Sequence, residues 1–421
     1  MNKPAFPQDY SFKLSDSLFG IQTLFIAFGA TVLVPIITGM DPSVALFTAG
    51  LGTLIFQVIT KGQIPVFLGS SFAFVPATIY SISTWGIEAA LFGLAVCGIV
   101  YFAMSLLVYV RSQEFVNRLF PTLITGPIIM NIGLVLAPVA INMAMGKTGK
   151  GDVIPGLEQN TALMIAGISL LATILTRLFG KGRIALIPIL VGIVCGYIAS
   201  LWFGIVDFNT VANASWFQLP EFRTPSVNWQ CALLMIPIAA VSAIEHIGDI
   251  VAIGGITRRN YVRYPGLHRS LLGDGVATMV ASSIGGPPSI TYAEVTAGVA
   301  ITKTYNPGIM TWASLAAIAL AFVGKVGAFL HTVPTPVMGG VLVLLFGAIT
   351  VTGLHLLTQS QYDLMSPRNM TIVGIVLVVP VGGLTLGADN FVISGIGLGG
   401  LAGVLLNILL PQDKETKPAV V

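Results

Sequence analysis

The stretch Gly285-Gly-Pro-Pro-Ser-Ile-Thr-Tyr-Ala-Glu-Val-Thr-Ala-Gly-Val-Ala-Ile-Thr302 interrupts a chain that is apolar almost everywhere. It does not open as a helix, because Pro287 and Pro288 lack backbone donors and a proline disfavours helical geometry in the residue before it. The residues from Ser289 to Ala293 are small or favour strands, which predicts a short extended segment. The apolar run that begins at Glu294 predicts a helix. The sequence therefore places a carboxylate beside a change from extended to helical backbone.

The composition places this stretch inside a membrane. The chain has 421 residues, of which 55% are hydrophobic and 9% are charged, which indicates a polytopic membrane protein and excludes a water-soluble domain. Irregular backbone at membrane depth is tolerated only where it is buried in protein or lines a cavity. A broken transmembrane helix with an ionisable side chain is the usual form of a transporter site. The polar first fifteen residues predict no signal peptide.

We predict an all-α polytopic membrane protein with fourteen transmembrane spans. The third and tenth spans are short and broken, and Pro380 and Gly382-Gly383 interrupt the thirteenth. In order, the predicted spans are residues 18–40, 43–60, 66–83, 87–110, 119–144, 161–179, 184–206, 229–256, 267–284, 286–302, 308–330, 334–357, 370–387 and 391–410.

Basic residues are distributed unevenly between the two sides of this topology. With the N-terminus inside, three basic residues fall outside, namely Lys147, Lys150 and Arg223, and Lys325 lies within a span. The sixteen that fall inside are Lys3, Lys13, Lys61, Arg111, Arg118, Arg177, Lys181, Arg183, Arg258, Arg259, Arg263, Arg269, Lys303, Arg368, Lys414 and Lys417. Because cytoplasmic loops are enriched in Lys and Arg, we expect both terminal tails, 1–17 and 411–421, in the cytoplasm and the protein in the cytoplasmic (inner) membrane.

A weak internal repeat divides the spans into two sets of seven. Residues 120–126 (FPTLITG) open the fifth span and 333–339 (VPTPVMG) open the twelfth. By the same offset the third span, with 69–76 (GSSFAFVP), pairs with the tenth. Since seven is odd, the two halves are expected to be inverted relative to each other. Their short extended segments would meet and pair as antiparallel strands, which would satisfy their backbone groups.

Four of the seventeen acidic residues lie within the predicted spans: Glu245, Asp249, Asp274 and Glu294. Each costs on the order of 3 kcal/mol at the centre of a bilayer, so a functional role is favoured. The alternative is that they bond buried hydroxyls or backbone donors and hold helices together, most plausibly for Asp274. Glu245 and Asp249 are four residues apart and share one helical face, and His246 adjoins Glu245.

These acids favour a proton as the coupling ion. Four neighbouring carboxylates cannot all be ionised in a low dielectric, so at least one is expected to hold a proton. Glu245, His246, Asp249 and Asp274 are the candidate proton-coupling residues, with His246 open to a packing role, and sodium remains an alternative. No metal site is expected, because no second histidine or cysteine clusters here.

Other classes of ligand leave no signal in the sequence. The three cysteines, Cys97, Cys195 and Cys231, lie in or beside separate apolar segments, so neither a disulfide framework nor a metal cluster is expected. We expect no cofactor and no nucleic-acid partner. Lys and Arg are not expected in the neighbourhood of the four acids, which favours a neutral or cationic solute with N–H donors.

Aromatic residues stand at the two breaks. Phe72, Phe74 and Tyr292 could stack on a planar ring, although packing is the commoner role for each.

Several short motifs, in order from about residue 15 to 410, carry a resemblance to a known family. They are 28–35 (FGATVLVP), 61–65 (KGQIP), 68–74 (LGSSFAF), 245–248 (EHIG), 265–269 (PGLHR), 291–294 (TYAE), 300–302 (AIT) and 336–340 (PVMGG). The chain resembles the nucleobase–cation symporters of the nucleobase–ascorbate transporter family, and within it the bacterial uracil permeases most.

The resemblance implies a fold of two inverted seven-span repeats and a function. A core domain would comprise 18–110 and 229–330, and a gate domain 119–206 and 334–410, with homodimers formed through the gate. The protein would be a proton-coupled importer of uracil and not an enzyme, and would work by alternating access.

The resemblance also implies a substrate site between the strands of the third and tenth spans. Glu245 and Glu294 would hold the nucleobase, the backbone at Phe72 and Ala293 would complete the contacts, and Tyr292 is a further candidate. The lipid bilayer and the nucleobase are the expected partners.

The sequence departs from the family pattern at several positions. Val295 and Ala297 replace an Asn and a Gly, and Ala293 replaces the Gly of uracil permeases. Thr23 stands in place of a histidine, and Asp249 in place of the histidine of close relatives. Glu294 favours uracil, and a xanthine or purine permease is the alternative.

Other functional classes are less favoured. An anion exchanger of the same architecture would require a basic residue or bare helix N-termini at the site. An intramembrane hydrolase would require Asp249 and Asp274 to form a pair of acids. A channel is disfavoured because broken helices with buried acids suit occlusion better than a continuous pore.

Overall fold

The structure is a computed structural model that describes residues 9–111, 121–182, 184–360, 362–388 and 391–411. Among these residues, seven helices are long and apolar enough to cross a membrane. They are α1 (Ser17–Thr38), α2 (Pro42–Ile59), α4 (Ile87–Arg111), α6 (Thr122–Ala144), α7 (Gln159–Phe179), α10 (Trp229–Thr257) and α15 (Thr335–Gln359). The chain is thus a multi-pass membrane protein. Most of the predicted tails, residues 1–8 and 412–421, and the start of the fifth span at 119–120 lie outside the described residues.

Shorter elements complete the bundle. The helices are α3 (Val75–Trp85), α8 (Pro188–Trp202), α9 (Asn209–Asn213), α11 (Leu267–Ser283), α12 (Ala293–Thr302), α13 (Gly308–Ala321), α14 (Gly324–His331), α16 (Pro367–Val381) and α17 (Gly395–Leu409). Single turns lie at η1 (Leu14–Asp16), η2 (Phe72–Phe74), η3 (Ile184–Leu186) and η4 (Val262–Gly266). The predicted helical class is confirmed, while the count of fourteen spans stays a prediction.

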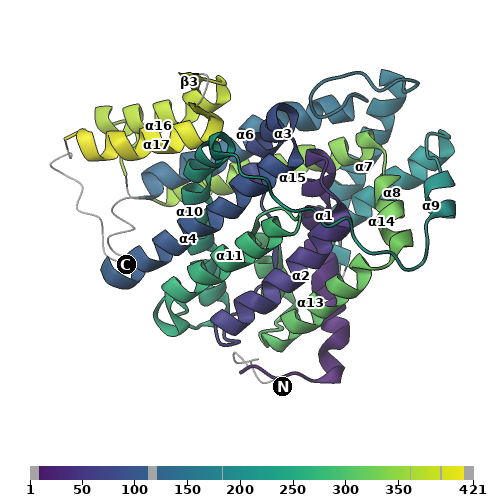
Figure 1. Ribbon diagram of the computed structural model, residues 1–421, viewed down its shortest axis with the longest axis horizontal. Coiled ribbons are helices and arrows are strands. Elements are labelled where there is room, and N and C mark those ends of the chain that lie inside the picture. The colour runs from purple at the N-terminus through teal and green to yellow at the C-terminus, as the bar shows by residue number, and fades with distance from the viewer. Residues whose placement is uncertain (1–8, 112–120, 183, 361, 389–390, 412–421) are drawn as a thin grey trace.

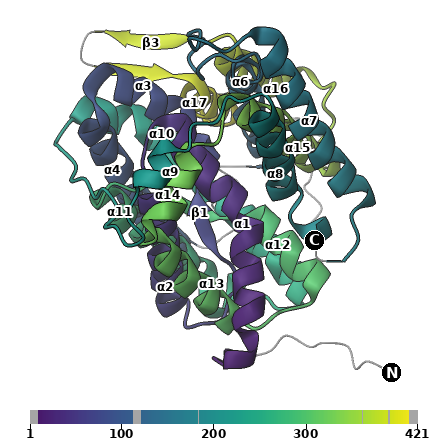
Figure 2. The same ribbon diagram turned by 90° about the vertical axis from the view of Figure 1, so that its right-hand side faces the viewer.

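The two predicted strands form and pair. Strand β1 (Leu68–Ser70) runs antiparallel to β2 (Ser289–Thr291), with Leu68 opposite Thr291 and Ser70 opposite Ser289. All six residues are buried, and β1 lies beside α1 in the interior (Figure 2). Pairing gives each extended segment backbone partners that the surrounding apolar side chains do not offer.

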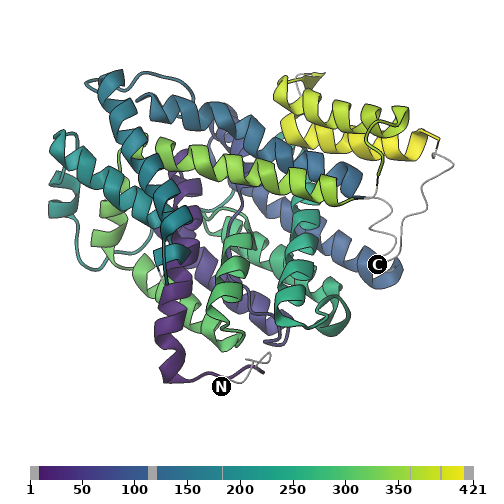
Figure 3. The same ribbon diagram turned by 180° about the vertical axis from the view of Figure 1, so that it is seen from behind.

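Helix packing carries the signature of the inverted repeat. The closest packing joins α6 to α15, α4 to α11, and α2 to α13. In the predicted repeat, each span of the first half corresponds to the span seven places later. Under this correspondence α6 and α15 are equivalent to each other, and the packing of α4 on α11 is equivalent to that of α13 on α2. The same operation maps the packing of α7 on α8 onto that of α16 on α17, which lie side by side at one end of the molecule (Figures 1 and 3).

The predicted thirteenth and fourteenth spans, 370–387 and 391–410, are wrong at their facing ends. Helix α16 ends at Val381 and α17 begins at Gly395, and between them β3 (Thr385–Ala388) pairs antiparallel with β4 (Phe391–Ser394). Pro380 and the following Gly382-Gly383 end the helix. The apolar run after them favours strand as well as helix, and periodicity does not separate the two in a short segment.

Other helix boundaries also differ from the prediction. The span predicted at 308–330 breaks into α13 and α14, and at the break Val323 pairs with Phe217 of the loop after α9 in an isolated β-bridge. The span predicted at 184–206 ends as a helix at Trp202. In the span predicted at 286–302 only residues 293–302 are helical.

Candidate substrate site at the paired strands

Helix α12 begins where β2 ends, at the centre of the candidate site. Tyr292 is the extended N-cap residue and Glu294 lies in the first turn. The first bond of the helix runs from the Thr296 N–H to the Tyr292 carbonyl. The backbone N–H groups of Ala293, Glu294 and Val295 therefore precede the helical ladder, as at every helix N-terminus. This end combines backbone donors with the positive end of the helix dipole.

Tyr292 and Gly69 fasten the two strands together. The Tyr292 hydroxyl donates to the Ser70 carbonyl at 2.8 Å, and the side chain is 5% exposed. The ring lies so close to Gly69 that a Cβ there would come within 2.4 Å of it. The ring of Tyr292 therefore packs against β1, and a stacking contact with a ligand stays a prediction.

The described residues enclose a cavity of about 490 Å³ where α1 ends and α2 begins, and a second cavity of about 570 Å³ beside the strands. The second holds all five residues predicted to bind substrate. They are Phe72, Glu245, Tyr292, Ala293 and Glu294. Glu245 comes from α10 and Glu294 from α12, and both side chains are half-buried, while Ala293 is exposed. The structure thus brings the two predicted carboxylates to one cavity, with the α12 backbone donors beside them.

The opposite wall of this cavity comes from α6, α7, α8 and α15, which contribute Ile132, Thr173, Ile189 and Leu345 among others. Phe72 reaches toward that wall, where its ring meets Phe346 of α15 edge-on with centroids 5.8 Å apart.

Phe74, the other aromatic considered for stacking, does not reach the cavity. Its side chain is 1% exposed and belongs to the hydrophobic core. The packing role is the one that the structure gives it.

Arg177 corrects the expectation that no basic residue lies near the acids. It stands in the last turn of α7, is exposed and lines the same cavity as Glu294, on whose carboxylate its charge acts. More than one hundred residues separate the two in the sequence, and only the packing of α7 places them around one space.

The remaining predicted acids lie in a separate group with His246, in which Asp274 is buried and Asp249 is half-buried. His246 Nδ1 lies 2.7 Å from Asp274 Oδ2, and both side chains are 0% exposed. Asp249 Oδ2 accepts a hydrogen bond of 2.8 Å from the Thr291 hydroxyl. His246, Asp249 and Asp274 do not line the cavity. Thr291 does line it, and it also bonds Asp249. No group of three or more His, Cys, Asp or Glu among the described residues has the arrangement of a metal site.

Thr291 is the residue that the sequence reasoning missed. It ends β2, two residues before Ala293, and its Oγ1 lies 3.4 Å from His246 Nδ1 as well as within bonding distance of Asp249. The available signal was a hydroxyl in a strand one residue from the candidate ligand Tyr292, but its partners on α10 follow only from the fold.

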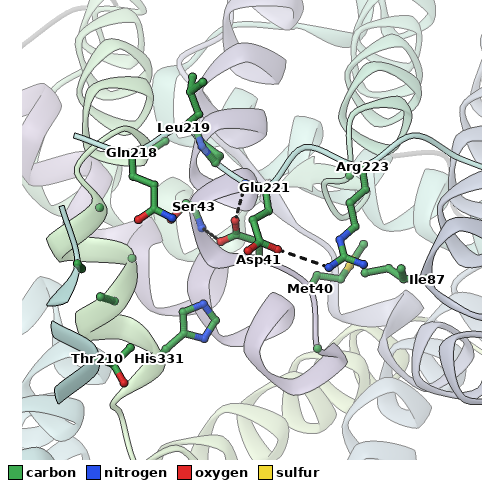
Figure 4. Close-up of a pocket in the computed structure, with 18 of the residues that line it drawn as sticks. Met40, Asp41, Ser43, Ile87, Thr210, Gln218, Leu219, Glu221, Arg223 and His331 are labelled. Atoms are coloured by element: carbon green, nitrogen blue, oxygen red, sulfur yellow. Dashed lines mark hydrogen bonds and ion pairs between the residues drawn. The ribbon is translucent and has the colours of Figure 1, made fainter. Parts of the chain in front are cut away.

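The 490 Å³ cavity lies where α1 ends and α2 begins, and the loop that follows α9 forms part of its lining (Figure 4). Asp41 there accepts from the backbone N–H groups of Ser43 at 2.7 Å and Glu221 at 3.0 Å. The Glu221 carboxylate meets Arg223 at 3.5 Å. Asp41 thus joins the loop to the start of α2. The two cavities have no lining residue in common.

Comparison with known proteins places the chain among permeases. The family model Xan_ur_permease, described as a permease family, matches residues 14–388. A probable uracil permease of Haemophilus influenzae is 46% identical over 403 residues, 96% of each chain. A uracil permease of Bacillus caldolyticus is 42% identical over 420 residues, 98% of this chain and 96% of that one. The transmembrane domain of a cyanobacterial bicarbonate transporter, BicA, shares the fold with a TM-score of 0.64 at 16% identity, over 94% of this chain and 97% of that one.

Proposed function

This chain belongs to the permease family that matches it over residues 14–388, and from that membership we propose that it imports uracil together with protons across the cytoplasmic membrane of a bacterium. The family consists of permeases, so the expected class of transporter, not enzyme, holds. The named relatives over nearly the whole chain are uracil permeases, which supports a nucleobase as the substrate.

The observation that carries the proposal is the meeting of Glu245, Glu294 and the α12 N-terminus in one cavity. Uracil presents N–H donors and carbonyl acceptors on alternating positions of its edge. Ionised carboxylates accept from the N–H groups, and such charged hydrogen bonds are the stronger ones. Backbone N–H groups near Ala293 would donate to the carbonyls. The site therefore offers both acceptors and donors for this edge.

Alternating access would arise between two groups of helices. We assign residues 18–110 and 229–330 to a core domain that carries the strands, and 119–206 and 334–410 to a gate domain, which would also form the homodimer. The cavity runs along α12 from Ala293 to Ile301 and reaches Arg177 of α7. Ile301 and Arg177 lie near the helix ends that are predicted to be cytoplasmic. This conformation would be the one open to the cytoplasm.

Arg177 would add a positive charge at the cytoplasmic mouth. An anionic solute would still meet two carboxylates deeper in the cavity, which favours a neutral nucleobase over an anion. The likeness to a bicarbonate transporter is one of fold at 16% identity and supplies no substrate.

Uptake into cells tests the substrate and the coupling together. Cells that express the protein should accumulate labelled uracil, a protonophore should abolish the accumulation, and removal of sodium should leave it intact. An excess of unlabelled uracil should compete more strongly than xanthine. Stronger competition by xanthine would replace uracil with a purine as the substrate.

The topology can be tested by labelling single cysteines. Lys150 and Asn260 are both exposed, in loops predicted to face opposite sides. In a background with Cys97, Cys195 and Cys231 changed to Ala, a membrane-impermeant maleimide added to intact cells should label Lys150→Cys and not Asn260→Cys. Permeabilised cells, in which both should react, are the control. The opposite pattern in intact cells would invert the topology and contradict the cytoplasmic placement of the termini.

A further inference from the structure

Two threonine hydroxyls hold β2 in place, one at each end of the strand. Thr278 of α11 bonds the backbone of Ser289 on both sides: its Oγ1 donates to the Ser289 carbonyl at 2.9 Å and accepts from the Ser289 N–H at 3.1 Å. At the other end, Thr291 donates to Asp249 Oδ2 of α10 at 2.8 Å. The hydrogen bonds of Thr278 are made to neutral backbone groups, whereas that of Thr291 is made to a carboxylate. Only the second can respond to a proton.

The hydrogen of the Thr291 hydroxyl is directed at Asp249 by its surroundings. His246 Nδ1 lies 2.7 Å from Asp274 Oδ2 and 3.4 Å from Thr291 Oγ1. The buried Asp274 carboxylate at that distance favours a hydrogen on Nδ1 of the imidazole. An Nδ1 that carries a hydrogen cannot accept from the Thr291 hydroxyl, so Asp249 Oδ2 is the acceptor within reach.

We propose that Thr291 couples protonation of Asp249 to the substrate site, by a hydrogen bond that ties β2 to the ionised carboxylate. This inference rests on the proposed function and names its coupling element. Hydrogen bonds to an ionised acceptor are roughly twice as strong as those between neutral groups. Adding a proton to Asp249 converts the carboxylate to a neutral acid and weakens the bond that holds the last residue of the strand.

The strand end leads directly into the residues that face substrate. Tyr292 follows Thr291 and holds β1 through Ser70, and Ala293 and Glu294 come next in the cavity wall. A change at Thr291 is therefore transmitted through one to three peptide units. Thr291 is a positioning residue, since it acts on the ligand contacts through its neighbours.

Other charges around Asp249 bear on its titration. Glu245 on the same helix, Glu294 on α12 and Asp274 on α11 all act on it electrostatically, and His246 faces it across Thr291. Because these acids also respond to pH, the contribution of Thr291 has to be isolated by comparing variants and cannot be read from one pH profile.

The test is a double-mutant cycle read in the pH dependence of uracil binding. Affinity of purified protein is measured from about pH 4 to 8, where carboxylates and histidine titrate, for wild type, Thr291→Val, Asp249→Asn and the double variant. The two single variants should change the pH profile in the same way, and the double variant should add no further change. Thr291→Ser, which keeps the hydroxyl, should restore the wild-type profile.

Thr278→Val is the matched control for a structural effect. It removes a hydroxyl that holds the same strand through hydrogen bonds to the Ser289 backbone, so it should weaken binding or lower the melting temperature while leaving the shape of the pH profile unchanged. If Thr291→Val does not fold, Thr291→Ala takes its place in the cycle. A wild-type pH profile in the Thr291 variant would overturn the proposal, as would additive effects in the double variant or an equal change in Thr278→Val.

The outcome is separable from the proposed function. If wild-type protein binds no uracil at any pH, the substrate assignment fails, and the same variants can be compared in the pH dependence of thermal unfolding. There the nonadditivity between Thr291 and Asp249 should persist, because the hydrogen bond exists without substrate. Additive shifts in the unfolding profile would overturn the link itself.

Discussion

Glu294→Gln is expected to lower the affinity for uracil by at least tenfold. The change keeps the shape of the side chain but replaces an acceptor-only carboxylate with an amide that is half donor. A hydrogen bond to a charged group contributes roughly 1.5–3 kcal/mol, and about 1.4 kcal/mol corresponds to one decade in affinity. Equilibrium binding of uracil and xanthine to purified wild type and variant at fixed pH measures the effect.

Glu221→Gln provides the matched control for this change. Glu221 is an exposed acid in the other cavity, so the same substitution there should leave uracil affinity unchanged. Because the amide offers a donor as well as an acceptor, Glu294→Gln is also expected to gain some affinity for xanthine. A folded Glu294→Gln protein with unchanged uracil affinity would remove Glu294 from the site, and with it the main reason for choosing uracil over xanthine.

Asp249→Asn is expected to abolish proton-driven accumulation of uracil while leaving binding within about tenfold of wild type, because weakening one hydrogen bond costs about 1 kcal/mol. Asp249 lies outside the cavity wall and bonds Thr291, not a cavity-facing ligand residue. An amide still accepts the Thr291 hydrogen bond but does not take up a proton. The measurement compares two modes in proteoliposomes: accumulation driven by a pH gradient, and exchange of labelled for unlabelled uracil at equal pH.

Exchange serves as the internal control for Asp249→Asn, because it requires binding and the conformational change but no net proton movement. The expected pattern is exchange retained and accumulation lost. If equilibrium binding disappears together with both modes, Asp249 belongs to the binding site and the separation of binding from coupling is contradicted.

The elements with a local cause were predictable from the sequence. Pro287 and Pro288 exclude a helix wherever the chain goes, so the strand that follows and its break before Glu294 are readable from the residues alone. The four-residue spacing of Glu245 and Asp249 likewise fixes one helical face. The antiparallel partner, β1, followed from the offset between the halves of the chain.

The features that depend on distant segments were not predictable. Arg177 and Glu294 line one cavity because the fold brings α7 and α12 to the same space. Thr291 contacts His246 and Asp249 of α10. No spacing or motif in the sequence indicates that these residues are partners. The hairpin of β3 and β4 was read as helix because a short apolar run carries both signals. In each case tertiary packing decides, and local propensity is too weak to reveal it.

Transport by the purified protein alone is the most direct test of the central claim. Proteoliposomes that contain only this protein are given an inward proton gradient and labelled uracil, with and without a protonophore. The account predicts accumulation of uracil above its external concentration, collapse of that accumulation with the protonophore, and no accumulation by Glu294→Gln protein at the same uracil concentration. Accumulation that is indifferent to the proton gradient, or an absence of uracil uptake by folded wild-type protein, would contradict it.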